Sequence, residues 1–160
     1  MFVLARAVTY ATLFIGFLLV FLPARLLARS GVTSPPAIGV AQAMGVLAAA
    51  IGAALALWCI LTFALIGKGT PAPFDAPRHL VVRGPYKFVR NPMYLGATAA
   101  LAGAALFYES AALAGYAGAF LLVMSAFVMF YEEPTLRTTF GAEYVDYCRR
   151  VRRWWPRLKG

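Results

Sequence analysis

The sequence predicts an all-α integral membrane protein that forms a single domain over residues 1–160. Hydrophobic residues make up 62% of the chain and charged residues only 13%, which leaves too little polar surface to cover a soluble domain of this size. Four apolar segments approach the roughly 20 residues that a helix needs to cross a bilayer. We therefore expect about four transmembrane helices, at residues 2–22, 37–66, 93–108 and 111–131.

The first two predicted spans differ in length. The segment 2–22 is interrupted only by Arg6, whose side chain can extend to the lipid headgroups. A signal peptide is disfavoured because the apolar stretch is long and Pro23-Ala-Arg25 is a poor cleavage site. The segment 37–66 would extend about 45 Å as a helix, so we expect it to tilt, to bend near Gly52 or to begin in the interface.

The last two predicted spans are separated only by Glu109 and Ser110, which predicts a tight antiparallel helical hairpin. Small residues recur at four-residue spacing within the spans, and this spacing permits close contact between helices in lipid. The pairs are Gly45 and Ala49, Ala99 and Gly103, and Ala114 and Gly118. We interpret them as helix-packing positions rather than as a binding site.

The basic residues predict the orientation of the chain. The net charge is +9, and an N-terminus in the cytoplasm places the basic residues of the connection 67–92 and of the tail 132–160 on the cytoplasmic side. Only Arg25 and Arg29 then face outward, as the positive-inside rule favours. Both termini are therefore expected in the cytoplasm. The charge suits anionic membrane lipids, and no motif indicates a nucleic-acid partner.

The cysteines and the histidine exclude several chemistries. Cys59 lies in a predicted span and Cys148 in the cytoplasmic tail, so no disulfide is expected. One histidine, His79, and two distant cysteines cannot supply the usual zinc ligands, so no metal is predicted. The sequence also lacks a GxxxxGK phosphate loop and a GxSxG nucleophile motif.

The connection 67–92 is the first of two polar segments that hold the candidate chemistry. It is rich in proline and places Pro92 as the first residue of the third span. Free backbone donors at that helix start, together with the charge of Arg90, can receive an anionic group. An ordinary basic loop that binds lipid headgroups is the alternative.

The tail 132–160 is the second such segment. It begins with two carboxylates, and the following Pro134 is expected to break or kink the helix. Beyond it, an apolar stripe opposes a charged one, which predicts an amphipathic helix along the interface or over the bundle. The apolar stripe is Leu136, Phe140, Tyr144, Tyr147 and Val151, and the charged one is Arg137, Glu143, Asp146 and Arg150. Trp154 and Trp155 fit an interfacial aromatic belt.

These two segments resemble a family of membrane enzymes. The run Arg78-His-Leu-Val-Val-Arg-Gly-Pro-Tyr-Lys-Phe-Val-Arg-Asn-Pro-Met-Tyr94 and the run from Glu132 to Val151 look like motifs of the isoprenylcysteine carboxyl methyltransferase and phospholipid methyltransferase superfamily. The resemblance covers roughly half of the chain, up to Pro156. It implies an all-helical membrane methyltransferase that uses S-adenosylmethionine without a Rossmann domain or a metal.

The resemblance also implies which residues contact the cofactor. By motif position they are His79, Leu80, Val81, Tyr86, Asn91, Pro92, Met93, Tyr94 and Glu132. Backbone groups and Tyr86 would hold the adenosine and methionine parts, and Glu132 would accept hydrogen bonds from a hydroxyl or ammonium group. Methyl transfer from this cofactor is an in-line displacement, so it mainly requires positioning and a water-poor pocket. The catalytic residues stay open, with Tyr94, Tyr131, Glu133 and Arg90 as candidates by location.

Two departures from the family pattern bear on the substrate. Asn91 replaces the histidine of the usual Arg-His-Pro triplet, and its amide can still donate and accept hydrogen bonds. Val128 stands where the prenylcysteine branch carries a substrate-binding arginine. A carboxylate substrate would need another cation, for which Arg149, Arg150 and Arg153 are the candidates.

We therefore expect an enzyme that transfers a methyl group from S-adenosylmethionine to a lipophilic acceptor. The accepting group is a carboxylate, amine or thiol of an amphipathic small molecule or lipid, and an isoprenylcysteine-like carboxylate is among the candidates. A phospholipid amine N-methyltransferase is the alternative enzyme. A non-catalytic membrane protein that keeps the fold as a binding or scaffold module is the alternative of another class. The sequence does not predict the oligomeric state.

Overall fold

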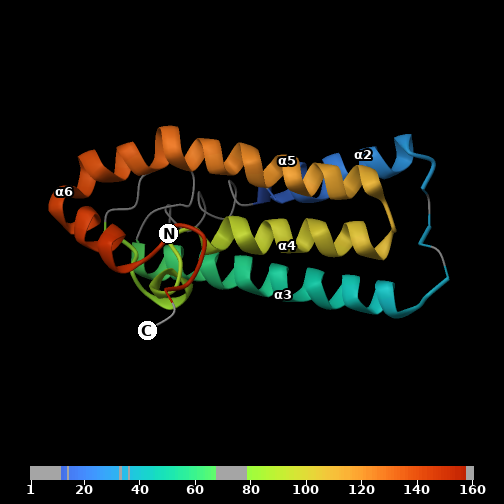
Figure 1. The fold of residues 1–160 in the computed structure, drawn as a ribbon, viewed down its shortest axis with the longest axis horizontal. Helices are drawn as coiled ribbons and strands as arrows, with labels where there is room; N and C mark the ends of the chain where they lie inside the picture. Colours follow the sequence, from blue (N-terminus) through green and yellow to red (C-terminus); the bar gives the residue numbers. More distant parts are fainter. Residues whose placement is uncertain (1–11, 14, 33, 36, 68–78, 158–160) are drawn as a thin grey trace.

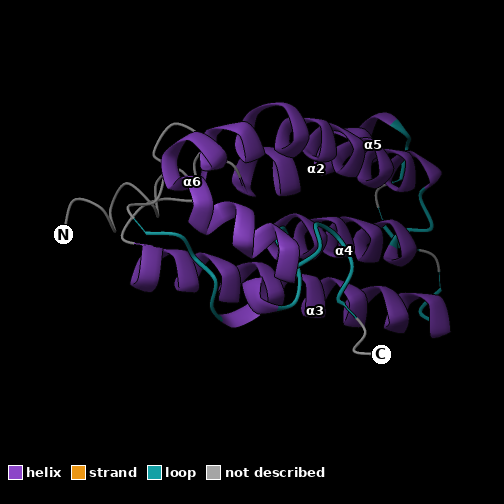
Figure 2. Ribbon diagram, turned by 60° about the vertical axis from the view of Figure 1, so that its left-hand side comes forward, coloured by secondary structure: helices purple, strands orange, loops and turns teal. Residues whose placement is uncertain are grey.

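The computed structural model describes residues 12–13, 15–32, 34–35, 37–67 and 79–157. Within these residues the regular structure is helical apart from one isolated β-bridge, which confirms the predicted all-α class for this part of the chain (Figure 2). The α-helices are α2 (Leu22–Arg29), α3 (Val40–Thr62), α4 (Pro92–Phe107), α5 (Ala111–Phe127) and α6 (Glu133–Arg150). The π-helical segments are η1 (Ile15–Phe21), η2 (Phe63–Gly67) and η4 (Val128–Glu132), and η3 (Gly84–Lys87) is a 3-10 turn.

The helices form an elongated bundle. Helices α3, α4 and α5 lie side by side with successive directions reversed, and α2 lies along α5 (Figure 1). The second, third and fourth predicted spans correspond to α3 with η2, to α4, and to α5 with η4. Most of the first predicted span, 2–22, lies outside the described residues, and the described part continues as helix to Arg29.

Among the residues that the structure describes, two helices are long and apolar enough to cross a bilayer: α3 and the continuous helix Ala111–Arg150. Only 17% and 22% of their apolar windows are buried, whereas the core helix of a soluble protein is mostly buried. Large outward side chains such as Leu57, Trp58 and Leu122 are exposed. Helices that are apolar on every face yet exposed are typical of membrane spans. The third apolar helix, α4, is shorter, at 16 residues.

Glycines set the distance between α3 and α4. A Cβ added to Gly52 would lie 2.5 Å from the backbone oxygen of Gly96, and one added to Gly103 would lie 2.5 Å from that of Gly45. No side chain fits at these distances, so the two backbones are in direct contact, as small residues permit in lipid. By contrast, a Cβ on Gly118 would meet nothing within 4 Å, so this predicted packing position is not used within the described residues.

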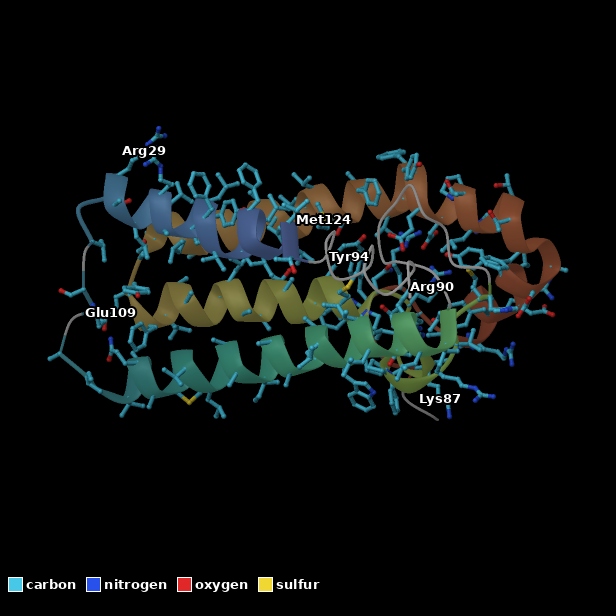
Figure 3. All side chains as sticks on the ribbon, turned by 180° about the vertical axis from the view of Figure 1, so that it is seen from behind. Arg29, Lys87, Arg90, Tyr94, Glu109 and Met124 are labelled. Carbon is cyan, nitrogen blue, oxygen red and sulfur yellow. The ribbon has the colours of Figure 1, made fainter. Side chains whose placement is uncertain are left out.

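Polar contacts fix the hairpin between α4 and α5, at the end of the bundle where Arg29 and Glu109 lie (Figure 3). The buried Gln42 of α3 donates from Nε2 to Oε1 of Glu109 over 2.9 Å, and its Oε1 accepts from the amide of Gly39 over 2.9 Å. The hydroxyl oxygen of Ser110 accepts from the amide of Leu113 and caps α5. The predicted tight hairpin is therefore present and is tied to α3.

The predicted break at Pro134 is absent, because the helix continues through this residue. A proline ring crowds the carbonyl four residues earlier, which here belongs to Phe130 inside the π-helical η4. The wider π-helical turn relieves that crowding. Thr135 donates its hydroxyl to the Tyr131 carbonyl over 2.7 Å. The break comes instead at Gly141, where φ is 50° and ψ is −123°.

The predicted amphipathic helix turns back over the loop that precedes α4. Its buried residues Tyr144, Tyr147 and Val151 pack with Leu80 and Val82 of that loop. The predicted charged residues on the opposite face are exposed. The Tyr147 hydroxyl also donates to the backbone oxygen of Tyr86 over 2.7 Å. The apolar stripe of α6 therefore serves to cover the loop.

We predict that Gly52→Ala destabilises the protein and that the matched change Gly118→Ala does not. The added methyl at Gly52 must push α3 away from α4, and overpacking of this kind costs about 1–3 kcal/mol. Thermal unfolding in detergent, followed by circular dichroism, measures the difference. Equal melting temperatures for the two variants would contradict the close α3–α4 contact.

We also predict that Tyr147→Phe destabilises the protein by about 1–3 kcal/mol, because it leaves the buried Tyr86 carbonyl without its donor. Tyr108→Phe is the matched control, since the Tyr108 hydroxyl makes no hydrogen bond within the described residues. Chemical unfolding of both variants in the same detergent provides the comparison. A loss of similar size in the control would argue against a specific role for the bond to Tyr86.

Candidate active site

The loop before α4 is anchored on the end of α3. Gly84 has a φ of +60°, which favours glycine, and a Cβ there would lie 3.1 Å from the Thr62 hydroxyl. The next turn, η3, buries the ring of Tyr86, which contacts Phe63 edge to face with centroids 5.2 Å apart. Tyr86 belongs to a buried cluster with Cys59 and Val81. The loop is thus held by packing on its α3 side.

Burial keeps the Tyr86 phenol neutral. Removal from water raises the pKa of Tyr86 well above its usual value, and the neighbouring Cys59, Glu132 and Tyr94 raise it further. A neutral phenol retains its proton and can donate a hydrogen bond.

The main contact of the site joins the two sequence segments that were predicted to bind the cofactor. The hydroxyl of Tyr94, on the first turn of α4, donates to Oε2 of Glu132 over 3.1 Å. Thirty-eight positions separate the two residues in the chain. Tyr94 is buried and Glu132 is half-buried. Figure 3 shows Tyr94 toward the end of the bundle that carries Lys87 and Arg90.

The other predicted cofactor residues fall on two sides of the loop. Val81 and Met93 pack with Tyr86 on the α3 side. Leu80 packs against α6, and His79 is exposed. Packing therefore occupies the side chains of Leu80 and Val81. Pro92 is buried as the first residue of α4, as predicted.

Asn91, which replaces the family histidine, faces the tail. It is buried, and its Nδ2 donates to the backbone oxygen of Arg153 over 3.4 Å. The amide of Arg90 donates to the backbone oxygen of Arg152 over 2.9 Å, and Val89 and Arg152 form a parallel β-bridge. The tail thus lies along residues 89–91, where its red ribbon meets the yellow-green loop in Figure 1.

Glu133 lies at the centre of an ion cluster. Arg153 donates from Nε and Nη2 to its two carboxylate oxygens over 2.8 and 2.9 Å, and Arg90 contributes Nη2 at 3.0 Å. The side chains of Glu133 and Arg90 are only 8% and 11% exposed. The bond to Glu133 raises the pKa of Arg153, so this guanidinium stays charged. One buried carboxylate is thus paired with two cations.

The structure shows which partners the candidate catalytic and substrate-binding residues contact. Among the catalytic candidates, Tyr94 contacts Glu132, whereas Arg90 and Glu133 pair with each other. Tyr131 is exposed and stacks on Phe127. The substrate-binding candidates are all engaged: Arg149 contacts Asp146, Arg150 donates to the Asp146 backbone, and Arg153 binds Glu133. Val128, at the position of the family arginine, is buried.

The sequence did not show which side chains of the loop and the tail pair with each other. Arg90, Glu133 and Arg153 were each considered as reactive or substrate-binding groups, and nothing in their spacing showed that they meet. The apolar stripe of α6 did indicate that the tail had a surface to cover. No cluster of three potential metal ligands occurs among the residues that the structure describes.

The arrangement offers defined chemistry at the end of the bundle. The Glu132 carboxylate can accept hydrogen bonds from a hydroxyl or ammonium group. The rings of Tyr86 and Tyr94 provide aromatic surface that suits a cation.

Comparison with known proteins identifies the family. The family model described as phospholipid methyltransferase matches residues 40–143, which includes α3, the loop, α4, α5 and the Glu132–Glu133 pair. No match was found among the curated proteins or among the solved structures. The matched segment is more than half of the chain and contains both halves of the site. The chain therefore belongs to the phospholipid methyltransferase family and is a membrane methyltransferase.

Proposed function

We propose that the protein transfers a methyl group from S-adenosylmethionine to the amine of a membrane phospholipid or a related amphipathic amine. The bond between Tyr94 and Glu132 carries the proposal, because it brings together the loop and tail motifs whose resemblance implies this cofactor. Family membership supports methyl transfer to a lipid.

The residues around this bond fit the cofactor by their chemistry. S-adenosylmethionine carries an ammonium group and ribose hydroxyls, which match the carboxylate of Glu132. Its sulfonium is a cation that aromatic faces such as those of Tyr86 and Tyr94 can stabilise. The protein's own task is then to bind and orient the two reactants and to exclude water. The cofactor, when bound, supplies the activated methyl group.

An amine acceptor is favoured over a carboxylate because the cations near the site are already engaged. Glu133 pairs with both Arg90 and Arg153, and Val128 replaces the arginine that a prenylcysteine carboxylate would require. The Glu132 carboxylate accepts a hydrogen bond from Tyr94 and has no cationic partner among the described residues, so its charge disfavours an anionic headgroup at this site. In the reaction the ammonium headgroup would first give a proton to water, and the nitrogen lone pair would then bond to the methyl carbon as the carbon–sulfur bond breaks and S-adenosylhomocysteine leaves.

The proposed topology places this site at the cytoplasmic face. The loop, Lys87 and Arg90 lie at one end of the bundle and Glu109 and Arg29 at the other (Figure 3). Four spans with both termini in the cytoplasm agree with the positive-inside rule. The cofactor would then enter from the cytoplasm, while the lipid enters sideways between helices.

We predict that detergent-purified protein binds S-adenosylmethionine and that Glu132→Ala raises the Kd at least about tenfold, because hydrogen bonds to charged groups contribute about 1.5–3 kcal/mol. Glu143→Ala, which removes an exposed carboxylate from α6, is the matched control and should bind as the wild type does. Isothermal titration calorimetry measures all three proteins. Absence of binding to folded wild-type protein would favour the non-catalytic scaffold alternative.

We also predict that the enzyme methylates an amine rather than a carboxylate. Protein in nanodiscs of phosphatidylethanolamine, given S-adenosylmethionine with a labelled methyl group, should yield lipid labelled on nitrogen. Phosphatidylcholine nanodiscs, whose amine is already fully methylated, are the control, and a farnesylcysteine acceptor tests the carboxylate. Mass spectrometry of the lipid extract distinguishes the products. A base-labile methyl ester on farnesylcysteine, without labelled amine, would reverse the assignment.

A further inference from the structure

The ion cluster around Glu133 contains two arginines, whereas a simple ion pair contains one. Two guanidinium groups meet one carboxylate, and the Nε of Arg90 is buried without a partner among the described residues. Arg153 holds Glu133 with two parallel hydrogen bonds, whereas Arg90 contributes one contact. Bidentate bonds of this kind fix direction as well as distance. Arg153 therefore sets the orientation of the Glu133 side chain.

Glu133 is adjacent to the carboxylate that faces the proposed cofactor. Successive residues on a helix point in different directions, so Glu132 and Glu133 face different partners. Glu132 meets Tyr94, and Glu133 meets Arg90, which precedes Tyr94 by four residues at the start of α4. Two neighbouring carboxylates thus contact two residues four positions apart, one before α4 and one in its first turn. This double contact fixes the rotation of the η4–α6 helix relative to α4.

We propose that Arg153 is a positioning residue of the cofactor site, acting through Glu133 to hold Glu132 against Tyr94. The inference rests on the proposed function. It adds a residue beyond the segment that the family model matches, since this segment ends at residue 143. The C-terminal tail thereby becomes a part of the active site without contacting the reactants.

Removal of the Arg153 side chain leaves the tail other attachments. The backbone oxygens of Arg152 and Arg153 accept from Arg90 and Asn91, and neither bond uses the Arg153 side chain. Val151 remains buried in the α6 cluster. Arg153→Ala should therefore keep its fold while Glu133 loses its bidentate partner. An effect of Arg153→Ala on cofactor binding can therefore be measured separately from any loss of the fold.

The test is a double-mutant cycle read out by S-adenosylmethionine affinity in the full-length protein. Calorimetry gives the Kd of the wild type, Arg153→Ala, Glu132→Ala and the double variant, and thermal unfolding checks each fold. We expect Arg153→Ala to raise the Kd about tenfold when Glu132 is present and by less than about twofold when it is absent, because residues that act through one another are not additive.

Two single variants complete the test. Arg153→Lys keeps the charge but loses the planar fork, so its Kd should lie between those of the wild type and Arg153→Ala. Arg157→Ala removes an exposed cation from the same tail and should bind as the wild type does. If Arg153→Ala does not fold, the cycle is run with Arg153→Lys. The increase in Kd caused by Arg153→Lys must likewise be smaller when Glu132 is replaced by alanine.

The outcomes separate this inference from the proposed function. Wild-type binding with an unchanged Kd for Arg153→Ala, or with effects that multiply in the double variant, overturns the positioning role alone. A lower melting temperature with an unchanged Kd does the same and leaves only a structural role. Failure of the folded wild type to bind overturns the proposed function and the positioning role with it.

Discussion

The direct backbone contact between α3 and α4 is the constraint on which the rest of the structure depends. Gly52 and Gly96 allow the two helices to meet without intervening side chains. Lipid provides no apolar driving force between helices, so this contact area and a few polar bonds hold the bundle together. The contact places the end of α3 directly beside the loop that Gly84 docks on it. The start of α4, and Tyr94 with it, is therefore fixed relative to that loop.

The adjacent carboxylates Glu132 and Glu133 differ in how fully they are paired, and under the proposed function Glu132 binds a ligand while Glu133 has a structural role. A carboxylate that binds a ligand must keep free acceptor capacity, whereas a buried carboxylate with a structural role must be fully paired. Glu133 satisfies the second requirement with two arginines, and Glu132 keeps one bond from a neutral phenol. The π-helical turn, which ends at Glu132, lets the helix continue through Pro134, so both side chains stay on one continuous helix.

The helical class, the two apolar helices long enough to cross a bilayer and the hairpin could be predicted because they follow from local properties: apolar length, small-residue spacing and a two-residue turn. The stripe on α6 likewise predicted which side of that helix is buried, but not that the loop residues Leu80 and Val82 lie beneath it. The predicted break at Pro134 was wrong, because the rule that proline interrupts a helix takes no account of a preceding π-helical turn. The members of the ion cluster could not be predicted from the sequence, since Arg153 and Arg90 are brought together only by the reversal at Gly141.

The ion cluster of Arg90, Glu133 and Arg153 suggests how the choice of substrate can change within one fold. A cation is useful for binding a carboxylate substrate only if no protein carboxylate has already neutralised it. Here both arginines that lie near the site are paired with Glu133, while Val128 presents no charge. The remaining charge beside Tyr94 is the negative one of Glu132. Under the proposed function, discrimination between amine and carboxylate acceptors requires no dedicated recognition residue, because the Glu132 carboxylate has no cationic partner among the described residues and repels a second carboxylate.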